Sequence, residues 1–120
     1  MNTTYKVEAS LLAVGNVTAT LFKVGFGDPA QNDQIVRDAE SRMTEVLAET
    51  AEKPEDGDAV PARNGELALV NGPASLPVAM VLAHKLGHLF GAVACFDPKL
   101  GKYVVSIAHG GKYAIGELVG

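Results

Sequence analysis

Two short runs of uninterrupted apolar residues, separated by a segment of helix length, constrain this chain more than any other feature. The runs cover residues 67–70 and 92–96, and residues 75–90 lie between them. Strands without alternation are typical of parallel sheets whose two faces are both covered. Parallel neighbours need a crossover, which is usually a helix. The segment therefore predicts a strand, a helix capped by Ser75, and a second strand parallel to the first.

The first half of the chain predicts a hairpin and a helix. Apolar residues alternate over 5–11 and 17–23 around a turn at 15–16, which indicates two antiparallel strands. Pro29 or Asp33 can begin the helix. Its apolar face comprises Ile35, Val36, Ala39, Met43, Val46 and Leu47. The opposite face is expected to be solvated and carries Arg37, Asp38, Glu40, Arg42, Glu45 and Glu49.

The remaining segments complete an α+β pattern. Residues 97–101 have the composition of a turn, residues 103–107 are expected to return antiparallel, and residues 113–119 add a short edge strand. We expect one domain over residues 1–120, with one mixed sheet and two helices mainly on one face. Residues 52–66 are expected to form an exposed loop, whose acidic cluster is either solvated or binds a cation.

Charge and cysteine content exclude several classes of protein. Ten basic and fourteen acidic residues among 120 give a net charge of −4, which argues against a broad surface for long nucleic acids but allows a local pocket for a compact anion. The single cysteine, Cys95, excludes a disulfide framework and a cysteine-only zinc site, and its apolar neighbours predict burial. The amino terminus does not resemble a signal peptide, so we expect a cytoplasmic protein without membrane segments.

Five residues that follow the two buried strands are candidate ligand-binding groups. Asn71, Gly72 and Ser75 connect a strand to a helix N-terminus, where exposed amides and the helix dipole favour phosphate. Gly72 would let a ligand approach the backbone. Asp97 ends the second strand, where a carboxylate can bind a metal, transfer a proton or simply open the turn. Lys99 is a nearby cation.

The three histidines are the other candidates. His84 and His88 are four residues apart and share a helix face, so they either pack or bind a metal. Lys85 stands where a zinc protease has its glutamate, so the pair lacks that general base. His109 ends the returning strand.

Strand direction separates these candidates into two groups. Asn71, Gly72, Ser75, Asp97 and Lys99 are expected at one end of the molecule, the carboxylate end. His88 and His109 are expected at the other, the imidazole end. The strand expected from residue 92 to residue 97 spans about 16–20 Å. The two groups of residues therefore either perform separate tasks or meet between two stacked copies of the chain.

The second half of the chain, over residues 67–119, resembles a small CRISPR-associated family, the Csx-three group, also called Crn-three ring nucleases of type III systems. The resemblance rests on the spacing of four motifs: Val70–Pro73, Leu82–His88, Phe96–Gly101 and Val104–His109. It implies a ferredoxin-like fold and a homodimer, and the separation of the two ends leads us to expect that such dimers stack into a tetramer or filament. It also implies manganese-dependent cleavage of cyclic tetra-adenylate.

The resemblance also implies roles for single residues. His88 and Asp97 take the catalytic positions, and Asp97 is also the expected ligand of Mn²⁺. Lys99 stands where the family can carry arginine, and His109 matches a family histidine. Two alternatives stay open: a manganese-dependent exonuclease that trims adenosines from RNA 3′ ends, and a protein that binds cyclic oligoadenylate without cutting it.

Overall fold

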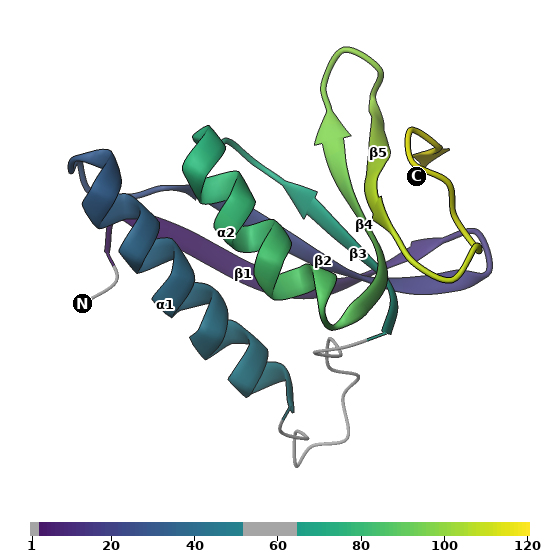
Figure 1. The fold of residues 1–120 in the computed structure, drawn as a ribbon, viewed down its shortest axis with the longest axis horizontal. Helices are drawn as coiled ribbons and strands as arrows, with labels where there is room; N and C mark the ends of the chain where they lie inside the picture. Colours follow the sequence, from purple (N-terminus) through teal and green to yellow (C-terminus); the bar gives the residue numbers. More distant parts are fainter. Residues whose placement is uncertain (1–2, 52–64) are drawn as a thin grey trace.

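Six strands form one mixed sheet in which the strands lie in chain order (Figure 1). The computed structural model describes residues 3–51 and 65–120, so the expected acidic loop lies outside the described residues except for Gly65 and Glu66. The strands are β1 (Tyr5–Val14), β2 (Val17–Phe26), β3 (Gly65–Asn71), β4 (Phe90–Asp97), β5 (Lys102–Ala108) and β6 (Leu118–Val119). The helices are α1 (Asn32–Ala51) and α2 (Leu76–Gly87).

The pairing of the strands confirms the predicted connections. β1 and β2 form an antiparallel hairpin, while β2, β3 and β4 are parallel neighbours joined through α1 and α2. β5 and β6 continue the sheet antiparallel. The result is an α+β sandwich compatible with the ferredoxin-like fold. In this protein each helical crossover joins two strands that are adjacent in the sheet. Because β2, β3 and β4 are parallel, their carboxyl ends and the N-termini of both helices lie at the same end of the molecule.

Each face of the sheet has its own apolar cluster. Ala68 packs toward the helices with Phe22, Met43 and Leu86, all of them fully buried. Leu67 and Leu69 point to the other face, where the buried cluster also includes Tyr103 and Val105. This second cluster is extended by Tyr113 and Val119, from the segment that follows β5. The expectation that residues 67–70 are covered on both faces is therefore confirmed, with the carboxyl-terminal segment covering the face that has no helix.

The predicted apolar face of α1 is confirmed, but one residue of its polar face is buried. Asp38 is 5% exposed, and its Oδ2 accepts a hydrogen bond of 2.7 Å from Oγ1 of Thr4, the residue just before β1. Gln34 Nε2 donates to the other carboxylate oxygen at 2.8 Å. These bonds stabilise the charged form, led by the bond from Thr4, and they lower the pKa of Asp38. The sequence pattern identified the helix face but not this partner in a distant segment of the chain.

α2 begins as predicted and ends earlier. Ser75 is its N-cap, and Ser75 Oγ accepts the backbone N–H of Val78 at 3.4 Å. The helix ends at Gly87 rather than at Phe90, which instead starts β4 opposite Gly65. The prediction of a helix through residue 90 was wrong because an apolar run does not mark where a buried helix gives way to a buried strand.

Cys95 is exposed, contrary to the expectation of burial. It lies on the face of β4 that carries the helices, but the two helices do not cover all six strands: α1 packs mainly on β1 and α2 on β4. The surroundings still reduce solvation of the sulfur, and this burial raises the pKa of the Cys95 thiol against the opposing effect of a hydrogen bond with Ser106. Within the part of the chain that the structure describes, neither helix has the length and apolar character needed to cross a bilayer.

Candidate functional site

The length of β4 separates the two groups of candidate residues. His88 immediately follows α2 and precedes β4, and Asp97 is the last residue of that strand. Seven steps of about 3.3 Å between Phe90 and Asp97 give roughly 23 Å. The imidazole of His88 and the carboxylate of Asp97 therefore cannot contact one reacting atom within a single chain.

At the carboxylate end, Asp97 opens the predicted turn. Its Oδ1 accepts the backbone N–H of Lys99 at 2.8 Å and that of Leu100 at 3.2 Å. The Gly101 N–H closes the turn by donating to the Asp97 carbonyl at 2.8 Å. The Lys99 side chain is exposed and forms no ion pair with any residue in 3–51 or 65–120. The turn thus carries an ammonium group that is unpaired among these residues and a carboxylate whose Oδ1 already binds the backbone.

Asn71 and Gly72 have structural partners of their own. Asn71 Nδ2 donates to Tyr103 Oη at 3.3 Å, on the face of the sheet opposite α2. Gly72 has a φ of +139°, and a Cβ at this position would collide with the backbone carbonyl of Val24. The close approach expected for a ligand at Gly72 is therefore made by the neighbouring strand. The sequence pattern suggested that Asn71 and Ser75 bind one ligand together. In the structure their side chains bond to different elements and do not face a common point.

Ser75 connects the N-termini of both helices. Its hydroxyl donates to Asn32 Oδ1 at 2.9 Å, and Asn32 is the first residue of α1. Two helix N-termini thus lie side by side at the carboxylate end, and each carries the positive end of a helix dipole. The sequence indicated only one of them here. Lys23 of β2 was also missed: it pairs with Asn71 across β2 and β3, a proximity that depends on strand order.

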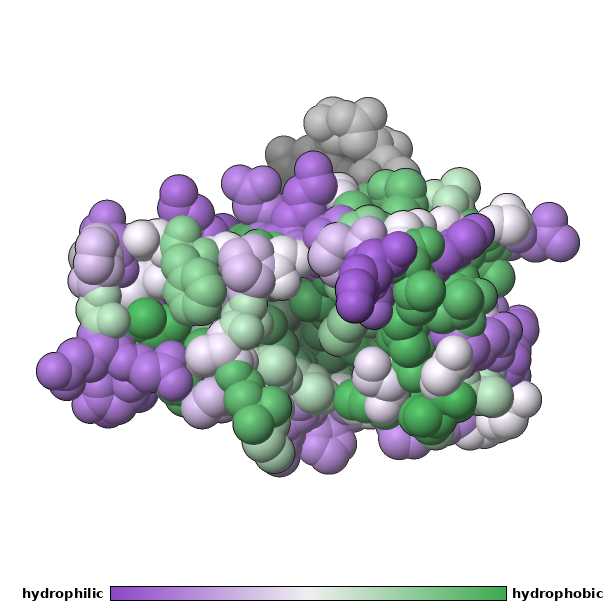
Figure 2. Space-filling model, turned by 90° about the horizontal axis from the view of Figure 1, so that it is seen from above, coloured by the Kyte–Doolittle hydropathy of each residue, from purple (hydrophilic) through white to green (hydrophobic). Residues whose placement is uncertain are grey.

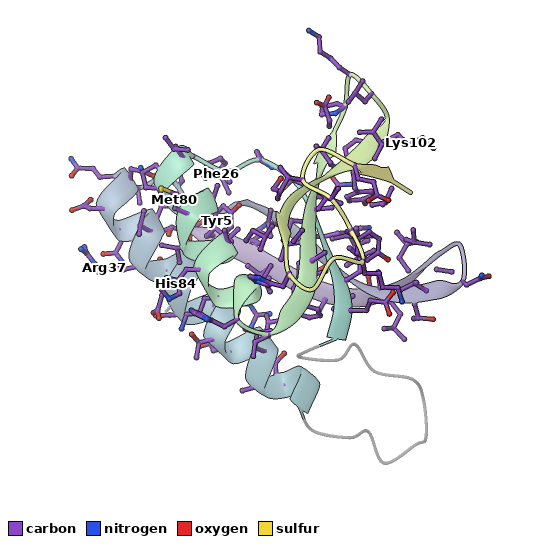
Figure 3. The ribbon with its side chains drawn as sticks, turned by 45° about the vertical axis from the view of Figure 1, so that its right-hand side comes forward. Tyr5, Phe26, Arg37, Met80, His84 and Lys102 are labelled. Atoms are coloured by element: carbon purple, nitrogen blue, oxygen red, sulfur yellow. The ribbon has the colours of Figure 1, made fainter. Side chains whose placement is uncertain are left out.

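His84 and His88 lie in a groove between α1 and α2. The rings of His84 and His88 make an edge contact with their centroids 4.8 Å apart. Both line a groove of about 800 Å³, together with Met80, Lys85 and Glu40. Lys85 Nζ lies 2.8 Å from Glu40 Oε2, which links the helices. Figure 3 shows His84 on the side of α2 that faces α1, far from Lys102 on the β4–β5 hairpin.

His109 lies at the imidazole end, as predicted. Its Nε2 is 3.0 Å from the carbonyl of Gly87, the last residue of α2, and its backbone N–H donates to Gly91. Donation by a ring N–H to this carbonyl satisfies one of the unpaired acceptors that every helix C-terminus leaves. His109 therefore fixes the end of α2, next to His88, and its own ring is held in one orientation.

The described residues of one chain do not form a manganese site by themselves. Mn²⁺ prefers several oxygen ligands in an octahedral arrangement. Asp97 supplies one carboxylate, and no group of three or more His, Cys, Asp or Glu side chains comes together in residues 3–51 and 65–120. Any ion at Asp97 would need ligands beyond the His, Cys, Asp and Glu side chains of these residues, such as substrate phosphates.

Comparisons with known proteins add no assignment to this geometry. No protein-family model matches the chain, and no curated protein matches it.

Proposed function

We propose that the protein is a ring nuclease that cleaves cyclic tetra-adenylate at a site shared by two copies of the chain. The separation of His88 from Asp97 along β4 carries this proposal, since both groups can act on one phosphodiester only if they come from different subunits. The two helix N-termini and the exposed Lys99 support phosphate binding at the carboxylate end. A small ring also fits the net charge of −4 better than a long RNA does.

In the proposed reaction, the carboxylate end of one dimer holds the ring while a stacked dimer brings its imidazole end to the other side. A ribose 2′-oxygen attacks the adjacent phosphorus, the bond from phosphorus to the 5′-oxygen breaks, and the proton lost from the 2′-hydroxyl is balanced by one gained at the 5′-oxygen. His88 positions the 2′-hydroxyl or protonates the leaving oxygen. Asp97 would hold Mn²⁺, which when bound supplies stabilisation of the phosphate charge, and Lys99 adds a second positive group. Two such cuts release linear di-adenylate.

A mixing experiment tests the shared site. His88→Ala and Asp97→Ala are purified separately, and each is expected to lose about 10²–10⁴-fold in turnover. Mixed in equal amounts, they rebuild intact sites from the Asp97 of one variant and the His88 of the other. We expect the mixture to recover up to about one quarter of wild-type turnover, because random assembly leaves both groups intact at that share of sites.

A control and a contrary outcome define the test. His88→Ala mixed with the double variant His88→Ala/Asp97→Ala must stay inactive, since no His88 is present. If both single variants fold and bind the ring but mixing never restores turnover, the shared site is wrong.

A binding protein without catalytic activity is the second candidate. The observation that favours it is the role of Asp97 in its own turn, where Oδ1 already accepts two backbone N–H groups. Incubation with cyclic tetra-adenylate and Mn²⁺, followed by chromatography, separates the two candidates. Linear di-adenylate supports the nuclease, and an intact ring that co-elutes with the protein supports the binder.

A further inference from the structure

A recess of about 220 Å³ opens between α2 and the uncovered parts of β4 and β5. Ala79, Leu82 and Ala83 of α2 form one wall, and Cys95 and Ser106 lie across from them. Protein interiors normally leave few voids larger than a water molecule. The recess exists because α2 presents alanines one turn apart at a place where the helix layer ends.

The recess belongs to the carboxylate end. Gly72 and Ala74, which directly precede the N-cap Ser75, line it. Figure 2 looks down on this end and shows apolar residues gathered around a hollow near its centre. A molecule seated in the recess can place its polar part beside the N-terminus of α2, where the positive end of the helix dipole favours anions. The amides of Val78 and Ala79 already donate to Ser75, and the proline before them has none, so the dipole rather than free N–H groups supplies this attraction.

The lining determines what the recess can accept. No charged side chain contributes to it, and the side-chain polar groups are the Cys95 thiol and the Ser106 hydroxyl. The volume is below the range of about 300–1,000 Å³ that is typical for drug-sized ligands. An uncharged, flat ring system that carries an external phosphate satisfies both conditions.

We propose that this recess is a nucleobase subsite that takes one adenine of the ring, with the attached phosphate at the N-terminus of α2. This inference rests on the proposed function for the identity of the base. The recess would then select the base while the helix end and Lys99 bind the phosphate, so that affinity depends on adenine as well as on charge.

The thiol of Cys95 reports occupancy directly, because it is the only cysteine in the chain. The wild-type protein is alkylated with iodoacetamide at pH 8 in the presence of adenosine 5′-monophosphate, ribose 5-phosphate or inorganic phosphate. We expect saturating adenosine monophosphate to slow labelling about tenfold while the other two leave the rate unchanged. No protection, or equal protection by ribose 5-phosphate, would overturn the inference.

A filled recess gives the second readout. Ala79→Phe places a ring in the recess and is expected to abolish protection and to weaken binding of cyclic tetra-adenylate about tenfold or more. Met80→Phe is the matched control, since Met80 is 67% exposed and lines the groove on the α1 side instead. If Ala79→Phe does not fold, the labelling result on the wild-type protein still decides.

The two proposals fail in different ways. A ring that is cleaved by the wild-type protein, without protection of Cys95 and with normal binding by Ala79→Phe, overturns the subsite and leaves the nuclease standing. Specific protection by adenosine monophosphate together with an uncut ring overturns the nuclease and leaves the subsite standing.

Discussion

The two ends of the molecule use their polar side chains differently. At the carboxylate end, Ser75 bonds to Asn32 and Asn71 bonds to Tyr103, each across two elements, while Asp97 bonds to the backbone of its own turn. At the imidazole end, His109 is held by Gly87, but the His88 ring is exposed and has no hydrogen bond within residues 3–51 and 65–120. The first end is built to keep its shape, and the second leaves an imidazole available to another molecule.

Binding and removal of Mn²⁺ test whether the carboxylate end holds an ion in the absence of substrate. Because no group of three or more His, Cys, Asp or Glu side chains comes together within residues 3–51 and 65–120, we expect Asp97→Ala to leave the calorimetric Mn²⁺ binding of the protein without ring unchanged. With the ring present, a chelator is expected to abolish turnover and added Mn²⁺ to restore it. Tight binding of Mn²⁺ to the protein alone that Asp97→Ala removes would contradict the difference between the ends, since it would require a preformed site at Asp97.

A pair of glycine variants compares the rigidity of the two ends. Gly72→Ala puts a methyl group against the Val24 carbonyl at a positive φ, so we expect a loss of about 1–3 kcal/mol or more of unfolding free energy. Gly87→Ala meets only the flexible Ile107 side chain, with its Cδ1 at 3.3 Å and its Cγ2 at 3.9 Å, and gains helix propensity, so we expect a change within about 1 kcal/mol. Urea denaturation measures both, and equal losses would remove this contrast.

The change in unfolding free energy between pH 7 and pH 3 tests the hydrogen bond between Thr4 and Asp38, which connects α1 to the segment just before β1. A carboxyl group with a lowered pKa stabilises the fold above its unfolded pKa of about 3.9, and this contribution is lost as the pH falls through the lower folded pKa. We expect Asp38→Asn to lower the urea midpoint at pH 7, with a smaller gap to wild type at pH 3. Asp33→Asn, an exposed control on the same helix, should change little. A gap for Asp38→Asn that does not vary with pH would contradict the assignment.

The sequence was sufficient for features that depend on local pattern or chain direction. Alternation gave the hairpin, the Ser75 cap gave the start of α2, and strand direction placed His88 and His109 together, away from Asp97. It was insufficient where a partner came from a distant element. The burial of Asp38 depends on Thr4, and the exposure of Cys95 depends on how many strands two helices can cover.

The candidate site shows the same limit. Gly72 was predicted to let a ligand approach the backbone, but the group that lies against it is the Val24 carbonyl. Lys23 and the helix pair at Ser75 and Asn32 could not be found without the strand order, because no local signal connects residues so far apart in the chain.

The dependence of turnover on protein concentration tests the central claim most directly. Specific activity toward cyclic tetra-adenylate is measured over a dilution series that passes through the dissociation of the assembly, followed in parallel by light scattering. A site shared by His88 and Asp97 of different chains predicts that activity per chain falls as the assembly separates. Constant activity per chain in a dissociated monomer would contradict it.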